Sequence, residues 1–238
     1  MPFSTSPRRL NLKMTRQPDD VTCGPTCLQS IYDYYGDNIS LEQVIREVPM
    51  LRGGGTLAAN LGYHALHRGY QATIYSFNLV LFDPSWAGLG TEDLLDKLDR
   101  QQRLKDSPKF NAATKAYKNF LTAGGQLRLD DITPDLILNY LNHKVPILTG
   151  LSATFLYRAK RENPVTNEPD DIKGEPVGHF VLLSGFDPLT RKLEITDPYH
   201  PNPVSTSQSY EVTLEHLVNA ILLGVLTYDA NLLILKKP

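Results

Sequence analysis

The order of two periodic patterns along the chain is the feature that most constrains its fold. Apolar residues recur at helical spacing from Pro25 to Tyr35, after Ser40, and from Leu57 to Arg68. Apolar runs of the kind that form strands dominate the second half of the chain. Helices that precede most of the strands predict an α+β fold rather than an alternating α/β fold.

Capping residues mark the ends of the first two predicted helices. Pro25 suits a first helical turn, and Gly36 follows the last apolar residue as a C-terminal cap. Ser40 and Gln43 match a capping box at the start of the second helix, which Pro49 ends.

The later elements are predicted from apolar runs bounded by turn residues. The predicted strands are 71–81, 145–151, 179–186, 192–196 and 227–235, and two further helices are predicted at 133–142 and 212–222. The segment 163–174 is rich in Pro, Asn and Asp, which indicates a loop.

The middle of the chain, residues 82–130, has a different character. It is polar and highly charged, with helical patterns at 92–104 and 112–121. We interpret it as a lid-like helical insertion into a single domain that spans residues 1–238. At about 150 residues per domain, the chain is long enough for one elaborated domain, and a core of this size needs no disulfide or metal.

Charge and hydropathy narrow the possible partners. The chain has 24 Lys and Arg against 26 Asp and Glu, a formal charge of −2, which argues against a dedicated nucleic-acid binder. No apolar run approaches the length of a membrane span, and no apolar stretch follows the arginines near the N-terminus. We therefore expect no membrane segment, no secretory signal and a cytoplasmic location; the oligomeric state stays open.

Two cysteines, four residues apart, stand at the start of the first helix. The N-terminus of a helix carries about half a positive charge, which favours the nucleophilic thiolate form of Cys23. Gly24 removes bulk beside the sulfur, where we expect a substrate backbone to approach. Cys27 lies one turn further along on the apolar face and is predicted to be a core residue. The pair is not a disulfide framework, and its spacing is not that of a Cys-x-x-Cys redox pair.

A thiolate nucleophile needs a general base and a group that orients this base. Among six histidines, His179 opens an apolar strand directly after Gly178. Counting back from the turn at 187–191 is expected to bring His179 opposite Asp197, or within one residue of it. That carboxylate would hold the imidazole in one tautomer and stabilise its charged form. Taken singly, a strand-end histidine and an Asp-Pro turn also fit purely structural roles.

Gln17 stands six residues before Cys23, in the loop that leads to the helix. A side-chain amide there can donate to a developing oxyanion, alongside the backbone N–H of Cys23. A solvated polar residue is the alternative reading of Gln17.

No cofactor or metal is predicted. His64 and His67 lie three apart on a predicted helix, but the neighbourhood lacks further ligands. The glycines at 53–55 are not followed by the Gly-Lys-Ser/Thr sequence of a phosphate-binding loop.

These motifs together resemble a known family. Gln17 with the Cys23–Leu28 segment, Gly178–Leu182 and Ile195–Pro198 are similar to the papain-like cysteine peptidases. The similarity is closer to the bacteriocin-processing, double-glycine leader peptidases and their stand-alone peptidase-like relatives. It implies a papain-like fold with N-terminal helices packed on an antiparallel sheet. It covers the start of the chain and residues from about 134 onward, and residues 82–130 match no family we can name.

The resemblance also implies roles for four residues: Cys23 as nucleophile, His179 as base, Asp197 as orienting acid and Gln17 as oxyanion donor. The function so predicted is hydrolysis of a peptide or isopeptide bond in a peptide or protein substrate. Two alternatives stay open. The same residues could serve a transpeptidase, amidase or deamidase, or the fold could be a catalytically silent peptide-binding module.

Overall fold

The computed structural model describes residues 8–105 and 107–237. The first seven residues of the N-terminal segment, for which no secretory signal was expected, lie outside the described residues, as do residues 106 and 238. The helices are α1 (Cys23–Tyr34), α2 (Leu41–Glu47), α3 (Ala58–His67), α4 (Thr91–Gln102), α5 (Pro108–Thr122), α6 (Pro134–Asn142), α7 (Ala153–Leu156) and α8 (Leu214–Leu223), with short 3-10 helices η1 (Pro84–Trp86) and η2 (Gly224–Thr227).

The strands form a single mixed sheet. They are β1 (Arg8–Arg9), β2 (Gln71–Ser76), β3 (Gln126–Arg128), β4 (Ile147–Ser152), β5 (Gly178–Asp187), β6 (Lys192–Thr196), β7 (Ser209–Thr213) and β8 (Asn231–Lys236). The strand order is β3-β2-β8-β4-β5-β6-β7, and β1 pairs with β5. The pairs are antiparallel as predicted, except that β3 runs parallel to β2.

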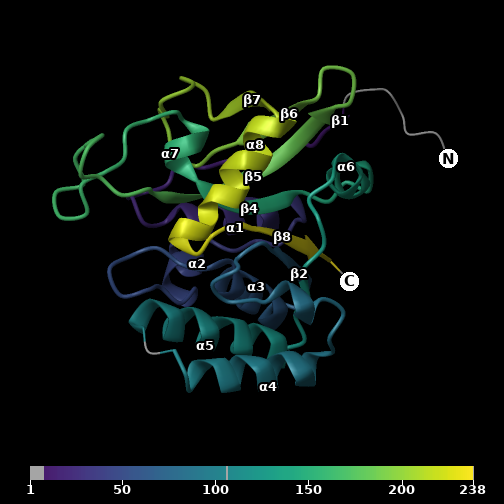
Figure 1. Ribbon diagram of the computed structural model, residues 1–238. Helices are drawn as coiled ribbons and strands as arrows, with labels where there is room; N and C mark the ends of the chain where they lie inside the picture. The colour runs from purple at the N-terminus through teal and green to yellow at the C-terminus, as the bar shows by residue number, and fades with distance from the viewer. Residues whose placement is uncertain (1–7, 106, 238) are drawn as a thin grey trace.

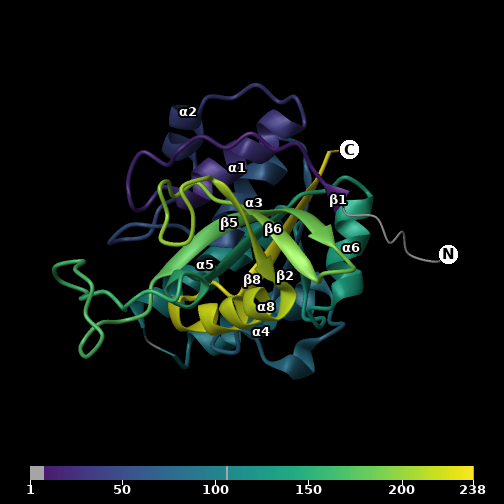
Figure 2. The same ribbon diagram turned by 90° about the horizontal axis from the view of Figure 1, so that it is seen from above.

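Helices cover both faces of this sheet, so the fold has three layers (Figures 1 and 2). Figure 2 shows α1 and α2 on one side of the strands and α8 on the other. On β5, Phe180 and Leu182 face the core that contains α1, while Val181 and Leu183 face the core that contains α8. Because a strand between two cores buries both sets of alternating side chains, β5 reads as a continuous apolar run.

The local signals at the first two helices are confirmed with small shifts. Helix α1 begins at Cys23, two residues before the predicted start, and Gly36 adopts the left-handed φ of +71° of a C-terminal cap. Ser40 Oγ accepts the N–H of Gln43 at 3.2 Å. The Gln43 side chain donates to Glu47 instead of returning to Ser40, so only half of the capping box forms.

The strand predictions fail at the end of one strand, at the start of the last strand and at three strands that were not predicted. Strand β2 ends at Ser76, because the chain then turns with the N–H of Leu81 bonded to the carbonyl of Asn78. The final strand begins at Asn231 instead of Thr227, since 224–227 forms a 3-10 helix. The strands β1, β3 and β7 were not predicted; β1 and β3 have only two and three residues, too few for a periodic pattern.

Two helices occupy the polar middle segment, as the helical patterns predicted. Helix α5 starts at Pro108, earlier than expected, because proline is well suited to a first turn. The α4–α5 pair lies beneath α3 in Figure 1. The ring of Phe120 packs so closely on Gly62 of α3 that a Cβ there would come within 2.6 Å. Strand β3 then returns the chain to the sheet edge, and the assignment of residues 82–130 as an insertion in a single domain stays a prediction.

Within the described ranges, no helix combines the length and apolarity needed to cross a bilayer.

Candidate active site

Helix α1 places Cys23 at its first position. Cys23 is 8% exposed and is a free thiol. No described side chain caps this helix end, and no acidic residue stands in its first turn. The positive end of the helix dipole is therefore left to act on the sulfur, which is the environment that stabilises a thiolate.

The β5–β6 hairpin brings His179 and Asp197 together, but not as the sequence count predicted. The register pairs Leu182 with Thr196, after a bulge between Leu183 and Gly185. Continued by one residue, this register sets Asp197 opposite Val181, two residues from His179. The prediction that they would lie opposite each other, or within one residue, was therefore wrong. The diagonal pair still lies on one face of the hairpin, and His179 Nε2 meets Asp197 Oδ1 at 2.9 Å.

Asp197 is fully buried and its carboxylate receives four hydrogen bonds. Oδ1 accepts from His179 and from the N–H of Tyr199 at 2.9 Å, and Oδ2 accepts from the hydroxyls of Tyr157 at 2.8 Å and Tyr210 at 2.7 Å. Burial raises the pKa of Asp197, but the charged His179 and these donors outweigh it and hold the pKa below its ordinary value. The carboxylate therefore stays ionised and fixes the ring of His179.

The two tyrosines were missed by the sequence reasoning. Tyr157 follows α7 and Tyr210 lies on β7, 40 and 13 residues from Asp197. Burial and the Asp197 charge raise the pKa of both hydroxyls, so both remain donors. No spacing pattern in the sequence points to this convergence.

His179 is held in its charged form by its two neighbours. Burial lowers the pKa of His179, but the Asp197 carboxylate and the Cys23 sulfur raise it, with a net value of about 10. Nε2 is hydrogen-bonded to Asp197, so Nδ1 is the ring nitrogen left free to exchange a proton in the cleft that His179 shares with Cys23.

Cys23 and His179 line one cleft with a volume of about 870 Å³. The loop of residues 53–55 forms part of its wall, with all three glycines at left-handed φ values of +97°, +98° and +73°. Among the described residues of the α4–α5 segment, Pro108, Lys109 and Ala112 at the start of α5 line the cleft. A lid-like role for residues 82–130 stays a prediction.

The backbone of Gln17 lies beside the site. Its N–H donates to the carbonyl of Pro198 at 2.9 Å, next to Asp197. Its side-chain Nε2 donates to the carbonyl of Asp19 at 2.8 Å, which leaves one amide hydrogen free. The described residues show no contact between this side chain and Cys23, so its role as oxyanion donor stays a prediction.

Gly24 and Cys27 both serve packing. A Cβ on Gly24 would come within 2.8 Å of Thr56 and 3.2 Å of Phe180, so the core leaves no room for a side chain at this position. Cys27 is fully buried and its Sγ–H donates to the carbonyl of Phe180 at 3.3 Å, which agrees with a core position.

Changing Tyr210 to Phe should test the support of Asp197. Removing a hydrogen bond to a charged group costs about 1.5–3 kcal/mol of stability. It should also raise the pKa of Asp197, so the acid limb of kcat/KM should move to higher pH. Urea unfolding and a pH–rate profile measure both effects. Tyr199→Phe is the control, because Tyr199 holds Asp197 through its backbone N–H; an equal shift in that variant would contradict the role of Tyr210.

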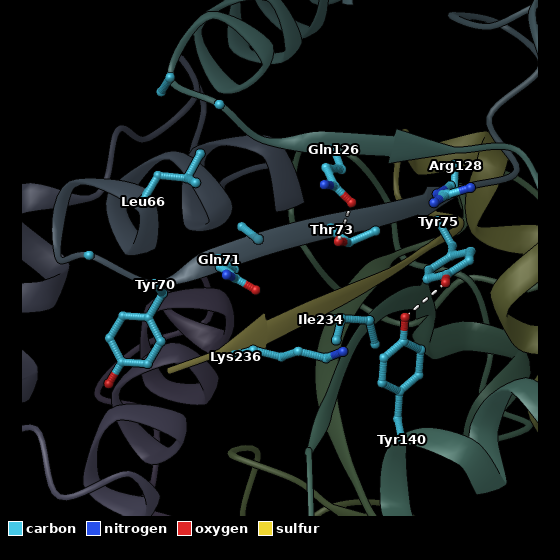
Figure 3. Close-up of a pocket in the computed structure, with 14 residues that line it drawn as sticks. Leu66, Tyr70, Gln71, Thr73, Tyr75, Gln126, Arg128, Tyr140, Ile234 and Lys236 are labelled. Carbon is cyan, nitrogen blue, oxygen red and sulfur yellow. Dashed lines mark hydrogen bonds between the residues drawn. The ribbon is translucent and has the colours of Figure 1, made fainter. Parts of the chain in front are cut away.

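A second hollow, of about 640 Å³, lies over β2, β3 and β8 (Figure 3). Figure 3 shows the hydroxyls of Tyr75 and Tyr140 turned toward each other, at 2.8 Å. Among the described residues that line it there is no cysteine, histidine or carboxylate. The Cys23 cleft is therefore the candidate active site.

Elsewhere, His64 is buried between Tyr32 and Glu47, and no described cluster of three or more His, Cys, Asp or Glu is arranged to hold a metal.

A helix that begins with a cysteine, packed on a sheet that carries a histidine–aspartate pair, is the papain-like α+β architecture predicted from the sequence. The chain belongs to the Peptidase_C39 like family, whose sequence profile matches residues 9–220. The predicted family is thereby confirmed. No curated protein sequence matches this chain.

Solved structures with a similar fold include three peptidases. A double glycine motif protease from an AMS/PCAT transporter, in complex with the leader peptide, has a TM-score of 0.46 and 16% identity, over 97% of this chain and 95% of that one. A putative C39-like peptidase from Bacillus anthracis has a TM-score of 0.49 and 14% identity, over 98% of both chains. Xylellain, a cysteine protease from Xylella fastidiosa, has a TM-score of 0.44 and 14% identity, over 98% of this chain and 86% of that one.

Proposed function

We propose that this protein is a cysteine peptidase that cleaves a peptide or isopeptide bond through Cys23, His179 and Asp197. One observation carries the proposal: a cysteine at an uncapped helix start shares a cleft with a histidine whose Nε2 is 2.9 Å from a buried carboxylate. These are the nucleophile, base and orienting group that acyl transfer requires.

The proposed reaction has two stages. The Cys23 thiolate attacks the substrate carbonyl, and the backbone N–H of Cys23 and the Gln17 amide stabilise the oxyanion. The His179 imidazolium gives its proton to the leaving amine, and an acyl-enzyme forms. Neutral His179 then takes a proton from water, which attacks the thioester and releases the acid. Asp197 stays ionised throughout and holds the imidazole in place.

The substrate in this proposal is a peptide or protein, and the reaction needs no cofactor. The double glycine motif protease cited above was solved with a leader peptide, which makes a peptide the first substrate class to test. The cytoplasmic location stays a prediction from the sequence.

Covalent labelling tests the proposal directly. A fluorescent peptidyl acyloxymethyl ketone should label the wild-type chain at one site, and Cys23→Ala should abolish labelling, because the sulfur forms the bond to the probe. Intact-mass spectrometry measures the adduct. Cys27→Ala is the matched control and should still be labelled, because it retains Cys23. Undiminished labelling of Cys23→Ala, or none of the wild type, would contradict the proposal.

A further inference from the structure

A second carboxyl group lies in the cleft and takes no part in the proposed reaction. Asp229 stands in the turn between η2 and β8 and lines the cleft with Cys23 and His179. It is only 6% exposed. The residues on either side of it, Tyr228 and Ala230, have left-handed φ values of +69° and +46°, a backbone shape that is costly for residues with side chains.

One of the two oxygens of the Asp229 carboxyl group has a hydrogen-bond donor in the protein. Oδ2 accepts the hydroxyl of Thr227 at 2.6 Å. Oδ1 has no hydrogen-bond donor among the described residues. It is also absent from the described polar atoms that are both inaccessible and without a partner, so Oδ1 keeps access to the cleft. No described lysine, arginine or histidine forms an ion pair with Asp229.

Glycines make the space around Asp229. A Cβ on Gly178 would come within 2.0 Å of Asp229 Oδ2, and Cβ atoms on Gly150 and Gly224 would lie 3.1 Å and 3.3 Å from its Cβ. Gly178 directly precedes His179, so the carboxyl group is beside the residue that carries the proton in the proposed reaction. A buried acid with an open oxygen costs free energy unless a partner arrives.

The charge of the cleft favours a cation as that partner. Its lining includes four acidic residues, Asp20, Glu162, Glu175 and Asp229, against Arg52, Lys109 and the charged His179. Burial, and then the charge of Asp20, raise the pKa of Glu162.

We propose that Asp229 forms a subsite for a basic side chain, lysine or arginine, of the peptide substrate. The open oxygen would accept an N–H of the cation and form a shielded ion pair beside the reacting bond. The proposal rests on the proposed function of the cleft as a peptidase site, and it adds the substrate chemistry that the site selects.

The pKa of Asp229 predicts a pH dependence of the preference for a basic residue, which tests the subsite without any variant. Burial raises the pKa of Asp229 to about 7, against the lowering effects of Thr227, Lys109 and His179. The titratable groups that face it are Lys109 and Tyr117 on α5 and His179 on β5. The pKa of His179 is about 10, and burial raises the pKa of Tyr117 well above its ordinary value. A preference for a basic residue should therefore be weak below pH 6 and grow as pH rises through about 7.

Matched probes test this. Two peptidyl acyloxymethyl ketones that differ only in lysine against norleucine are compared, with the variable residue last or second-last before the ketone. The wild type should label with the lysine probe about tenfold faster at pH 8, and Asp229→Asn should reduce the ratio to near one. Asp20→Asn, which removes an exposed carboxylate from the same cleft, should change the ratio by less than about twofold. Arginine replaces lysine in a second pair.

Each outcome decides one proposal. Labelling without a lysine preference, or a preference that survives in Asp229→Asn, would overturn the Asp229 subsite and leave the peptidase proposal intact. Absence of labelling by both probes would overturn the peptidase proposal. In that case, binding of the lysine and norleucine peptides to Cys23→Ala, by fluorescence anisotropy, decides the subsite. The pH dependence in the wild type needs no variant, so the inference remains testable if Asp229→Asn fails to fold.

Discussion

Replacing His179 with glutamine is expected to lower the rate of peptide hydrolysis by about 10⁴-fold or more, as loss of the base does in related acyl-transfer sites. The amide cannot take up the proton that the leaving amine needs, and it cannot stabilise a thiolate on Cys23. Initial rates on a fluorogenic peptide that the wild type cleaves measure the loss. His143→Gln is the control, because His143 is exposed and bonds only the carbonyl of Asn139 in its own helix.

The same variant should reveal the charge of His179 through stability. The folded-state pKa of about 10 lies above the unfolded value of about 6.5. A raised pKa of this kind contributes stability that is fully present below about pH 6.5 and lost as pH rises through about 10. The free-energy difference between wild type and His179→Gln in urea unfolding should therefore be largest near pH 6 and shrink toward pH 10.5. A difference that grows with pH would mean that His179 is buried in its neutral form.

Asp197→Ala is expected to be the most destabilising substitution in the site. It leaves the imidazole N–H and the hydroxyls of Tyr157 and Tyr210 buried without their acceptor. Breaking a buried charge pair in this way costs about 3–5 kcal/mol. The depressed pKa of Asp197 adds a pH signature, because its contribution is present above about pH 4 and is lost as pH falls through its folded value.

Asp197→Asn separates catalysis from folding. The amide can still accept hydrogen bonds, so the loss of stability should be smaller than in Asp197→Ala. Without the charge, the pKa of His179 should fall, and hydrolysis should slow by about 10³–10⁴-fold. Urea unfolding and kcat measure the two effects. Asp187→Ala, which removes an exposed carboxylate from the β5–β6 turn, is the control for both and should retain wild-type activity. Wild-type activity in Asp197→Asn would remove Asp197 from the proposed mechanism.

The features that the sequence predicted well are those encoded by neighbouring residues. Three of them depend on groups within a few positions of one another: helix α1, which begins two residues before its predicted start, the Ser40 cap and the β5–β6 hairpin. The hairpin turn indicated that His179 and Asp197 lie near each other, although the predicted offset between them was wrong. The bulge near Ser184 was not predicted, because no turn signal in the sequence marks it.

The sequence by itself determined the α+β class, the nucleophile candidate at a helix start and the histidine–aspartate pair. Only the tertiary structure decided what surrounds them: the hydroxyls of Tyr157 and Tyr210 on Asp197, and the half-open carboxyl group of Asp229 beside Gly178. The reason is physical. Periodicity and capping arise from hydrogen bonds and packing over a few residues, whereas these groups meet across tens of residues, where only the sheet order and the two cores bring them together.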